Sequence, residues 1–95
     1  MKDLEQVQRI VLEGLKGHRA RVYLFGSWAR GEERRISDID VGIEPLEPLP
    51  AGLLLDVQDA LDNSDVLYPV DLVNLDLAAP ALRERVLTEG MPWNG

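Results

Sequence analysis

Residues 24–43 read "LFGSWARGEERRISDIDVGI", a stretch that joins an apolar run to an alternating segment through a glycine-serine turn. The apolar run, "RVYLF" at 21–25, is short, β-branched and aromatic, which is typical of a buried strand. From Ser37 onward apolar residues alternate with polar ones, which predicts a second strand whose Asp38 and Asp40 share one face. The stretch therefore predicts two strands joined by a turn with acids close by.

Helical and strand patterns continue on both sides of this stretch. Apolar residues spaced by three and four predict an amphipathic helix over 3–16, ended by Gly17. "SWARGEE" at 27–33 predicts a short helix, and three prolines in 44–50 predict an ordered connection. A helix at 51–62, a strand at 68–75 and a helix from Pro80 to Gly90 complete the order. The pattern is that of a mixed α/β domain.

Length and composition limit the classes of protein that this chain fits. Its 95 residues predict one domain over 1–95, too small for a second domain that would bind substrate. With 45% hydrophobic and 28% charged residues the chain is typical of a globular protein, without a membrane-spanning run. The absence of cysteine excludes disulfides and thiolate metal sites. Together with a start unlike a secretory signal, it favours a cytoplasmic location.

The net charge of −7 argues against binding to long nucleic acid, because phosphate contacts need a surplus of Lys and Arg. Any polyanion must then be met by a local basic patch or by a bound cation. Arg30, Arg34 and Arg35 form such a cluster, although a solvated loop is the commoner role for such residues. Apolar residues in "GLLLDV" and in the tail "MPWNG" could lie in an interface, so a homo- or hetero-oligomer is possible.

The turn at Gly26 and Ser27 has the chemistry of a phosphate site. Unpaired backbone N–H groups meet the positive end of a helix dipole where a strand gives way to a helix. Glycine permits close approach of the backbone, and the Ser27 hydroxyl adds a donor. Arg30, three residues later, could contact the same anion. A plain strand-to-helix turn with an N-cap serine is the alternative.

Asp38 and Asp40 are spaced to bind a divalent cation together. Two residues apart on one strand face, their Cα atoms lie about 6.5 to 7 Å apart. Carboxylate oxygens of this kind select Mg²⁺ or Mn²⁺, which also bind waters and substrate phosphates. The alternative is two solvated side chains on a half-exposed strand. An EF-hand is excluded by Gly42 and Leu49 at its ligand positions, and a zinc site is disfavoured because His18 is the only histidine.

Asp71 is the predicted third acid. It points opposite to its apolar neighbours in the strand at 68–75, so it would join the other two acids if that strand paired beside the second. Three acids can hold two metal ions about 3.5 to 4 Å apart, an arrangement suited to phosphoryl transfer. Asp76 is the competing candidate and ranks lower because it falls near the loop before Pro80.

These residues resemble the nucleotidyltransferase superfamily of DNA polymerase β type, whose signature is a glycine-serine turn, D-x-D and a later acid. The stretch "GSWARGEERRISDIDVGI" is similar without a gap to the GSxARGxxxxxSDIDhxh pattern of the minimal nucleotidyltransferases. The resemblance implies a small mixed β-sheet with helices packed on one face. It also implies that Gly26 and Ser27 contact the triphosphate, that Asp38 and Asp40 bind metal, and that Asp71 is the third acid.

The resemblance further implies a function. Relatives of this size are nucleotidyltransferases that use Mg²⁺, two ions in the full site, and ATP as the substrate. The implied partner is a small helical HEPN-type toxin, whose hydroxyl would receive AMP from the antitoxin. The acceptor surface would then come from the partner. The alternative is an antitoxin that neutralises its toxin by binding alone, without catalysis.

Overall fold

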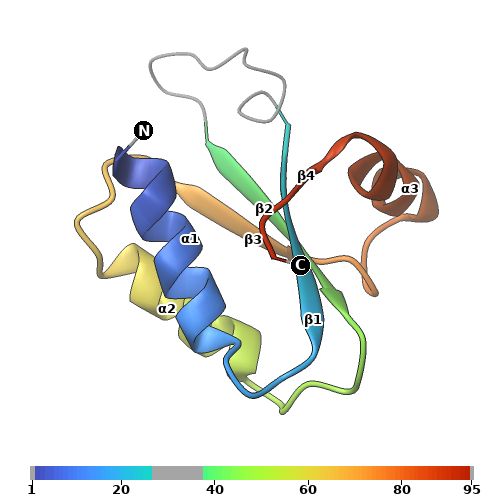
Figure 1. The fold of residues 1–95 in the computed structure, drawn as a ribbon, viewed down its shortest axis with the longest axis horizontal. Helices are drawn as coiled ribbons and strands as arrows, with labels where there is room; N and C mark the ends of the chain where they lie inside the picture. The colour runs from blue at the N-terminus through green and yellow to red at the C-terminus, as the bar shows by residue number, and fades with distance from the viewer. Residues whose placement is uncertain (1, 27–37, 95) are drawn as a thin grey trace.

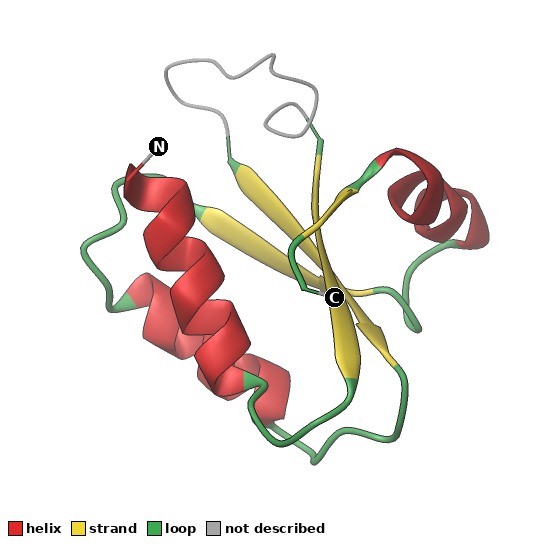
Figure 2. Cartoon of the chain, in the orientation of Figure 1, coloured by secondary structure: helices red, strands yellow, loops and turns green. Residues whose placement is uncertain are grey.

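The computed structural model describes residues 2–26 and 38–94, which form a four-stranded sheet between helices (Figure 1). The strand order is β3-β2-β1-β4. Figure 2 shows α1 and α2 on one side of this sheet and α3 on the other. The elements in chain order are α1 (Lys2–Gly14), β1 (Ala20–Phe25), β2 (Ile39–Pro45), α2 (Leu53–Asp62), β3 (Val70–Asn74), α3 (Pro80–Glu89) and β4 (Met91–Pro92).

The sheet is mixed, and its register aligns residues across three strands. β1 pairs antiparallel with β2, and β2 pairs parallel with β3. Phe25 faces Asp40, and Asp40 in turn faces Asp71, so these three residues form one row across the sheet. Side chains of directly paired residues lie on the same face. The pairing that would bring Asp71 beside the second strand is therefore confirmed.

One face of the sheet is covered by α1 and α2. Val7 and Val11 of α1 and Val57 of α2 are buried there, because apolar residues at helical spacing line one side of each helix. The strands contribute the alternate residues that point to the same side. This core contains Val22, Leu24, Ile39, Val41, Ile43, Leu61 and Val70. Burial on this face explains why the acids of β2 must lie on the other.

On the second face of the sheet, α3 covers only part of the surface. Val86 of α3 and Leu75 pack against Tyr23 in a smaller core. A Cβ atom at Gly42 would lie 3.1 Å from the Val86 side chain and 3.3 Å from Leu75, so the glycine lets α3 approach the sheet. Gly42 follows Asp40 by two residues and pairs with Tyr23, so it lies in the next row of side chains on this face. The helix thus covers the sheet up to that row and leaves the acids beyond it.

The mixed α/β fold is confirmed, with several differences in detail. The prediction that helices pack on one face of the sheet holds for α1 and α2, whereas α3 packs on the opposite face. The first helix ends at Gly14, and Gly17, at φ +87°, belongs to the turn that follows. The short helix predicted at 27–33 lies outside the described residues. Within those residues no helix is both long and apolar enough to cross a bilayer.

The C-terminal tail is part of the sheet. Met91 and Pro92 pair antiparallel with β1 as β4, which no periodicity predicted. Trp93 N donates to Val22 O at 2.8 Å, and the Trp93 side chain packs against the main core. Asn94 caps the same strand edge, since its side chain bonds Val22 N and Ala20 O. This tail therefore contacts its own sheet.

Candidate active site

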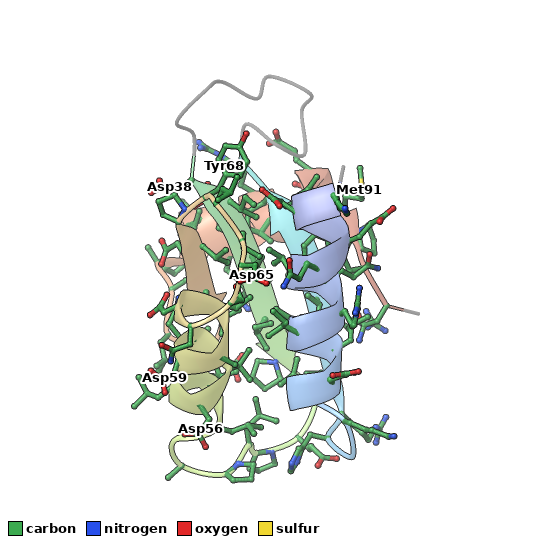
Figure 3. All side chains as sticks on the ribbon, turned by 90° about the vertical axis from the view of Figure 1, so that its left-hand side faces the viewer. Asp38, Asp56, Asp59, Asp65, Tyr68 and Met91 are labelled. Atoms are coloured by element: carbon green, nitrogen blue, oxygen red, sulfur yellow. The ribbon has the colours of Figure 1, made fainter. Side chains whose placement is uncertain are left out.

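The three predicted acids lie at one end of the sheet. Asp38 is exposed and directly precedes β2, Asp40 is half-buried within β2, and Asp71 is exposed near the start of β3. The register pairs Asp40 with Asp71, and alternation puts Asp38 on their face. Figure 3 shows Asp38 at the opposite end of the molecule from Asp56 at the start of α2. This cluster of acids thus lies at the end of the molecule away from Asp56.

Gly26 lies against this cluster. It follows β1 with φ +78°, a conformation that favours glycine. A Cβ atom placed on it would be 2.5 Å from Asp40 Oδ2, so the turn backbone and the carboxylate are packed together. The turn predicted to bind phosphate and the acids predicted to bind metal are therefore neighbours. The sequence gives no direct signal of this contact, because only the pairing of β1 with β2 creates it.

The electrostatics of the cluster oppose the charged form of its central member. Burial raises the pKa of Asp40 above its usual value of 3.8, and the negative charges of Asp71 and Asp38 raise it further. Because the folded state holds this proton more tightly than the unfolded state, the stability associated with it is lost as pH rises from about 3.8 through the raised pKa. At neutral pH the repulsion within this cluster lowers the stability of the metal-free protein.

Asp40→Asn is expected to stabilise the metal-free protein. A like-charge pair on neighbouring strands costs roughly 0.2–1 kcal/mol, so the melting temperature at pH 7 should rise by about 1–5 °C. Melting curves from pH 3.5 to 7 in a chelating buffer measure this, and the difference from wild type should shrink toward low pH. Asp65→Asn, which removes an exposed acid before β3, is the control. An equal rise in that variant would contradict a local cause.

The donor set fits Mg²⁺ in its chemistry. Carboxylate oxygens are the ligands that Mg²⁺ prefers, and a cation would remove the repulsion that raises the Asp40 pKa. The side chains as they lie do not close around one position, since no three His, Cys, Asp or Glu of residues 2–26 and 38–94 form a metal-binding group. The backbone register brings the acids together, and binding would require their carboxylates to turn toward one another.

The remaining candidates fall elsewhere or outside the described residues. Asp76 lies beyond the carboxyl end of β3, where its backbone N–H bonds Asn74 Oδ1 at 2.9 Å, so it is remote from Asp40 along the strand. Ser27 and Arg30, predicted to contact the nucleotide, lie within 27–37, outside the described residues. Gly42 has a packing role that the sequence patterns do not reveal. Because Gly42 has no side chain, α3 can pack close to the sheet beside the cluster.

Comparison with known proteins identifies the family. The family model described as polymerase beta, nucleotidyltransferase matches residues 15–92, a range that includes Gly26 and all three acids. Protein adenylyltransferase MntA of Shewanella oneidensis is 36% identical over 73 residues, which cover 73% of this chain and 49% of that protein. The chain therefore spans about half the length of this relative.

Solved structures give the same result for the fold. One, assigned as a minimal nucleotidyltransferase, has a TM-score of 0.75 and 35% identity, and the match covers 96% of this chain and 93% of the other. A crystal structure of a toxin–antitoxin with AMP-PNP has a TM-score of 0.72 and 28% identity, covering 93% of this chain and 73% of the other. The chain belongs to the polymerase β nucleotidyltransferase family.

Proposed function

We propose that this protein is a Mg²⁺-dependent protein adenylyltransferase, which transfers AMP from ATP to a hydroxyl of a partner protein. The observation that carries the proposal is the row formed by Asp40 and Asp71 on neighbouring strands, with the Gly26 turn packed against Asp40. The similar protein from Shewanella oneidensis is named as a protein adenylyltransferase, which supports AMP as the transferred group.

Gly26, Ser27 and Arg30 would bind the triphosphate. The left-handed backbone of Gly26 would direct the N–H groups of the turn toward phosphate oxygens, and its lack of a side chain lets the Asp40 carboxylate pack beside that turn. Ser27 and Arg30 would add a hydroxyl and a guanidinium donor, as their sequence spacing predicts. A similar crystal structure contains AMP-PNP, an analogue of ATP, which supports a nucleoside triphosphate as the ligand.

The proposed reaction is an in-line displacement at phosphorus. Asp38, Asp40 and Asp71 would hold Mg²⁺, which when bound supplies positive charge to the phosphate oxygens. Asp71, whose side chain is exposed, would accept the proton of the acceptor hydroxyl. The hydroxyl oxygen forms a bond to the α-phosphorus as the bond to pyrophosphate breaks. Positioning and charge neutralisation supply the rate, and no covalent enzyme intermediate is required.

The proposed partner is a HEPN-type toxin, for which this chain would be the antitoxin. The support is the resemblance to minimal nucleotidyltransferases and the likeness to a toxin–antitoxin crystal structure. Three further points stay predictions: that residues 1–95 form a single domain, that the protein acts in the cytoplasm, and that it forms an oligomer.

The test is the mass of the partner after the reaction. The proposed HEPN-type partner is incubated with this protein, ATP and MgCl₂, and its mass is then measured by intact-protein mass spectrometry. A mass increase of one or more AMP groups, with release of pyrophosphate, is the expected result. Complex formation without any mass change would instead favour an antitoxin that acts by binding alone. Omission of Mg²⁺ is the control.

A further inference from the structure

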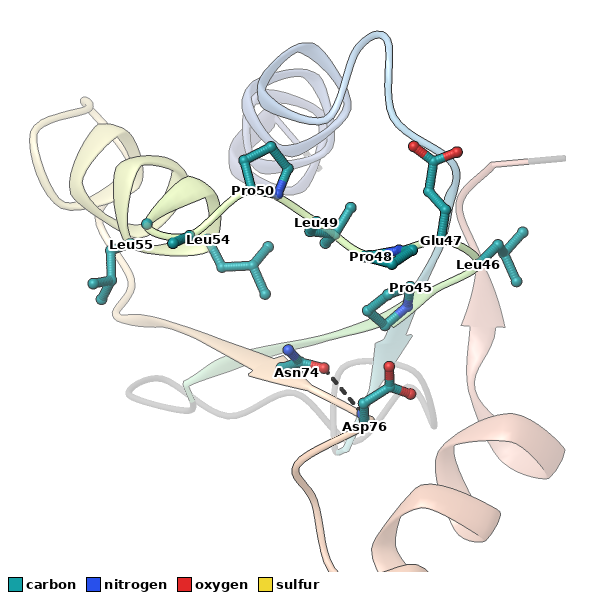
Figure 4. A pocket seen from close by; sticks show the side chains of 12 residues that line it. Pro45, Leu46, Glu47, Pro48, Leu49, Pro50, Leu54, Leu55, Asn74 and Asp76 are labelled. Carbon is teal, nitrogen blue, oxygen red and sulfur yellow. Dashed lines mark hydrogen bonds between the residues drawn. The ribbon is translucent and has the colours of Figure 1, made fainter.

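An apolar groove runs along the outer edge of β3, and none of the three acids lines it. Two hollows of about 680 and 490 Å³ adjoin each other there and share Leu54, Leu55 and Asn74 in their walls. The first lies between the proline-rich loop and the start of α2, and Figure 4 shows its wall. The second continues along β3 toward Leu77. We call these two hollows together the β3 groove.

Exposed leucines line the β3 groove. Leu55 is 75% exposed and lines both hollows, while Leu77, 84% exposed, lines the second. Leu46, 43% exposed, lines the first. A single exposed leucine is ordinary, but three that line two adjoining hollows are typical of a surface that another protein covers.

The ionisable residues that line the β3 groove are acidic. Residues 36–82 contain no Lys, Arg or His and ten Asp or Glu. Glu47 and Asp76 line the first hollow, and Asp59 and Asp62 follow Leu55 by four and seven positions on the same side of α2. An apolar surface with an acidic rim is complementary to an apolar surface with a basic rim.

The edge of β3 is partly occupied by hydrogen bonds from the Gln58 side chain, which disfavours an added strand. The side-chain amide of Gln58 donates to Val70 O at 2.8 Å, and Leu72 N donates to Gln58 Oε1 at 3.1 Å. Leu77 N donates to Asn74 O at 3.0 Å. An incoming strand would have to displace these bonds, whereas a helix binds such a groove through its side chains alone.

We propose that the β3 groove docks an amphipathic helix of a partner protein, one whose apolar stripe is flanked by Lys and Arg. The leucines of the groove would contact the stripe, and the acidic rim would contact the basic flanks. The inference goes beyond the proposed function and does not depend on it, because none of the three acids lines the groove.

A synthetic helical peptide tests this inference. The probe is a fluorescent peptide of about 20 residues with Leu at helical spacing on one face and Lys on the rest. Fluorescence anisotropy should show binding to the wild type that weakens as salt is added. The double variant Leu55→Gln with Leu77→Gln should bind at least about tenfold more weakly, because two exposed apolar contacts are lost. Leu67→Gln, at a leucine 86% exposed outside the groove, should bind like the wild type.

Three results would overturn the inference. The first is equal weakening by Leu67→Gln, and the second is equally tight binding of a peptide with Glu in place of Lys. The third is a wild-type dimer in sedimentation experiments that Leu77→Gln abolishes, since the groove would then bind a second copy of this chain. Two controls separate a lost contact from a folding defect. One is the single variant Leu77→Gln, which changes only a turn after β3, and the other is a melting curve of every variant.

Discussion

Asp71→Asn is expected to lower the rate of the proposed AMP transfer by at least about 10²-fold, the size of effect seen when one preorganised electrostatic group is removed from an active site. Asn retains the shape of the side chain and removes the charge. The carboxylate at 71 faces Asp40 across the sheet, so its loss would remove a metal ligand and the acceptor of the hydroxyl proton together. The measurement is the rate at which AMP-modified partner accumulates in the mass assay.

Asp76→Asn is the matched control for this variant. Asp76 is also an exposed aspartate on the same segment of chain, but it lies beyond the carboxyl end of β3 and bonds Asn74 through its backbone. At a saturating concentration of the partner, where a weaker contact at the rim of the β3 groove no longer limits the rate, we expect its transfer rate to equal that of the wild type. A loss of activity in Asp76→Asn with normal activity in Asp71→Asn would reverse the assignment of the third acid.

Gly26→Ala is expected to lower AMP transfer by up to about 10²-fold, because a misplacement of about 1 Å in a reacting site costs this much. The new Cβ would lie 2.5 Å from Asp40 Oδ2, and the carboxylate must move to accept it. The left-handed backbone at φ +78° adds a cost to stability of about 1–2 kcal/mol. Transfer rates and melting temperatures of the same preparations separate the two effects.

Gly17→Ala isolates the backbone cost. Gly17 has φ +87°, and nothing within 4 Å would meet a Cβ there. Both variants should lose a similar amount of thermal stability, about 5–10 °C in a domain of this size. Only Gly26→Ala should lose transfer. If the two variants transferred AMP at the same rate, the contact between the turn and Asp40 would have no part in the reaction.

The elements that periodicity marks could be predicted from the sequence. The segment that begins at Asp38 and contains Asp40 alternates because one face of β2 packs under α1 and α2, and this burial imposes a period of two. The same alternation separates Asp71 from Val70, which is buried in the main core. Placing Asp71 beside Asp40 then required only that the two strands pair as neighbours, which they do.

The features that depend on long-range contact could not be predicted. β4 has two residues, too few for any period, and it exists because Met91 and Pro92 meet the free edge of β1. The position of α3 depends on Gly42, whose missing side chain matters only once Val86 and Leu75 are placed above it. The contact of Gly26 with Asp40 likewise arises from strand pairing.

The most direct test of the central claim, that acids from two strands and the Gly26 turn form one metal–nucleotide site, is paramagnetic NMR with Mn²⁺ and AMP-PNP. Mn²⁺ broadens the amide signals of residues close to it. The expected result is selective broadening at Gly26, Asp40 and Asp71 at substoichiometric metal. Sharp signals at these residues, with broadening along α2 near Asp56 and Asp59 instead, would contradict the account.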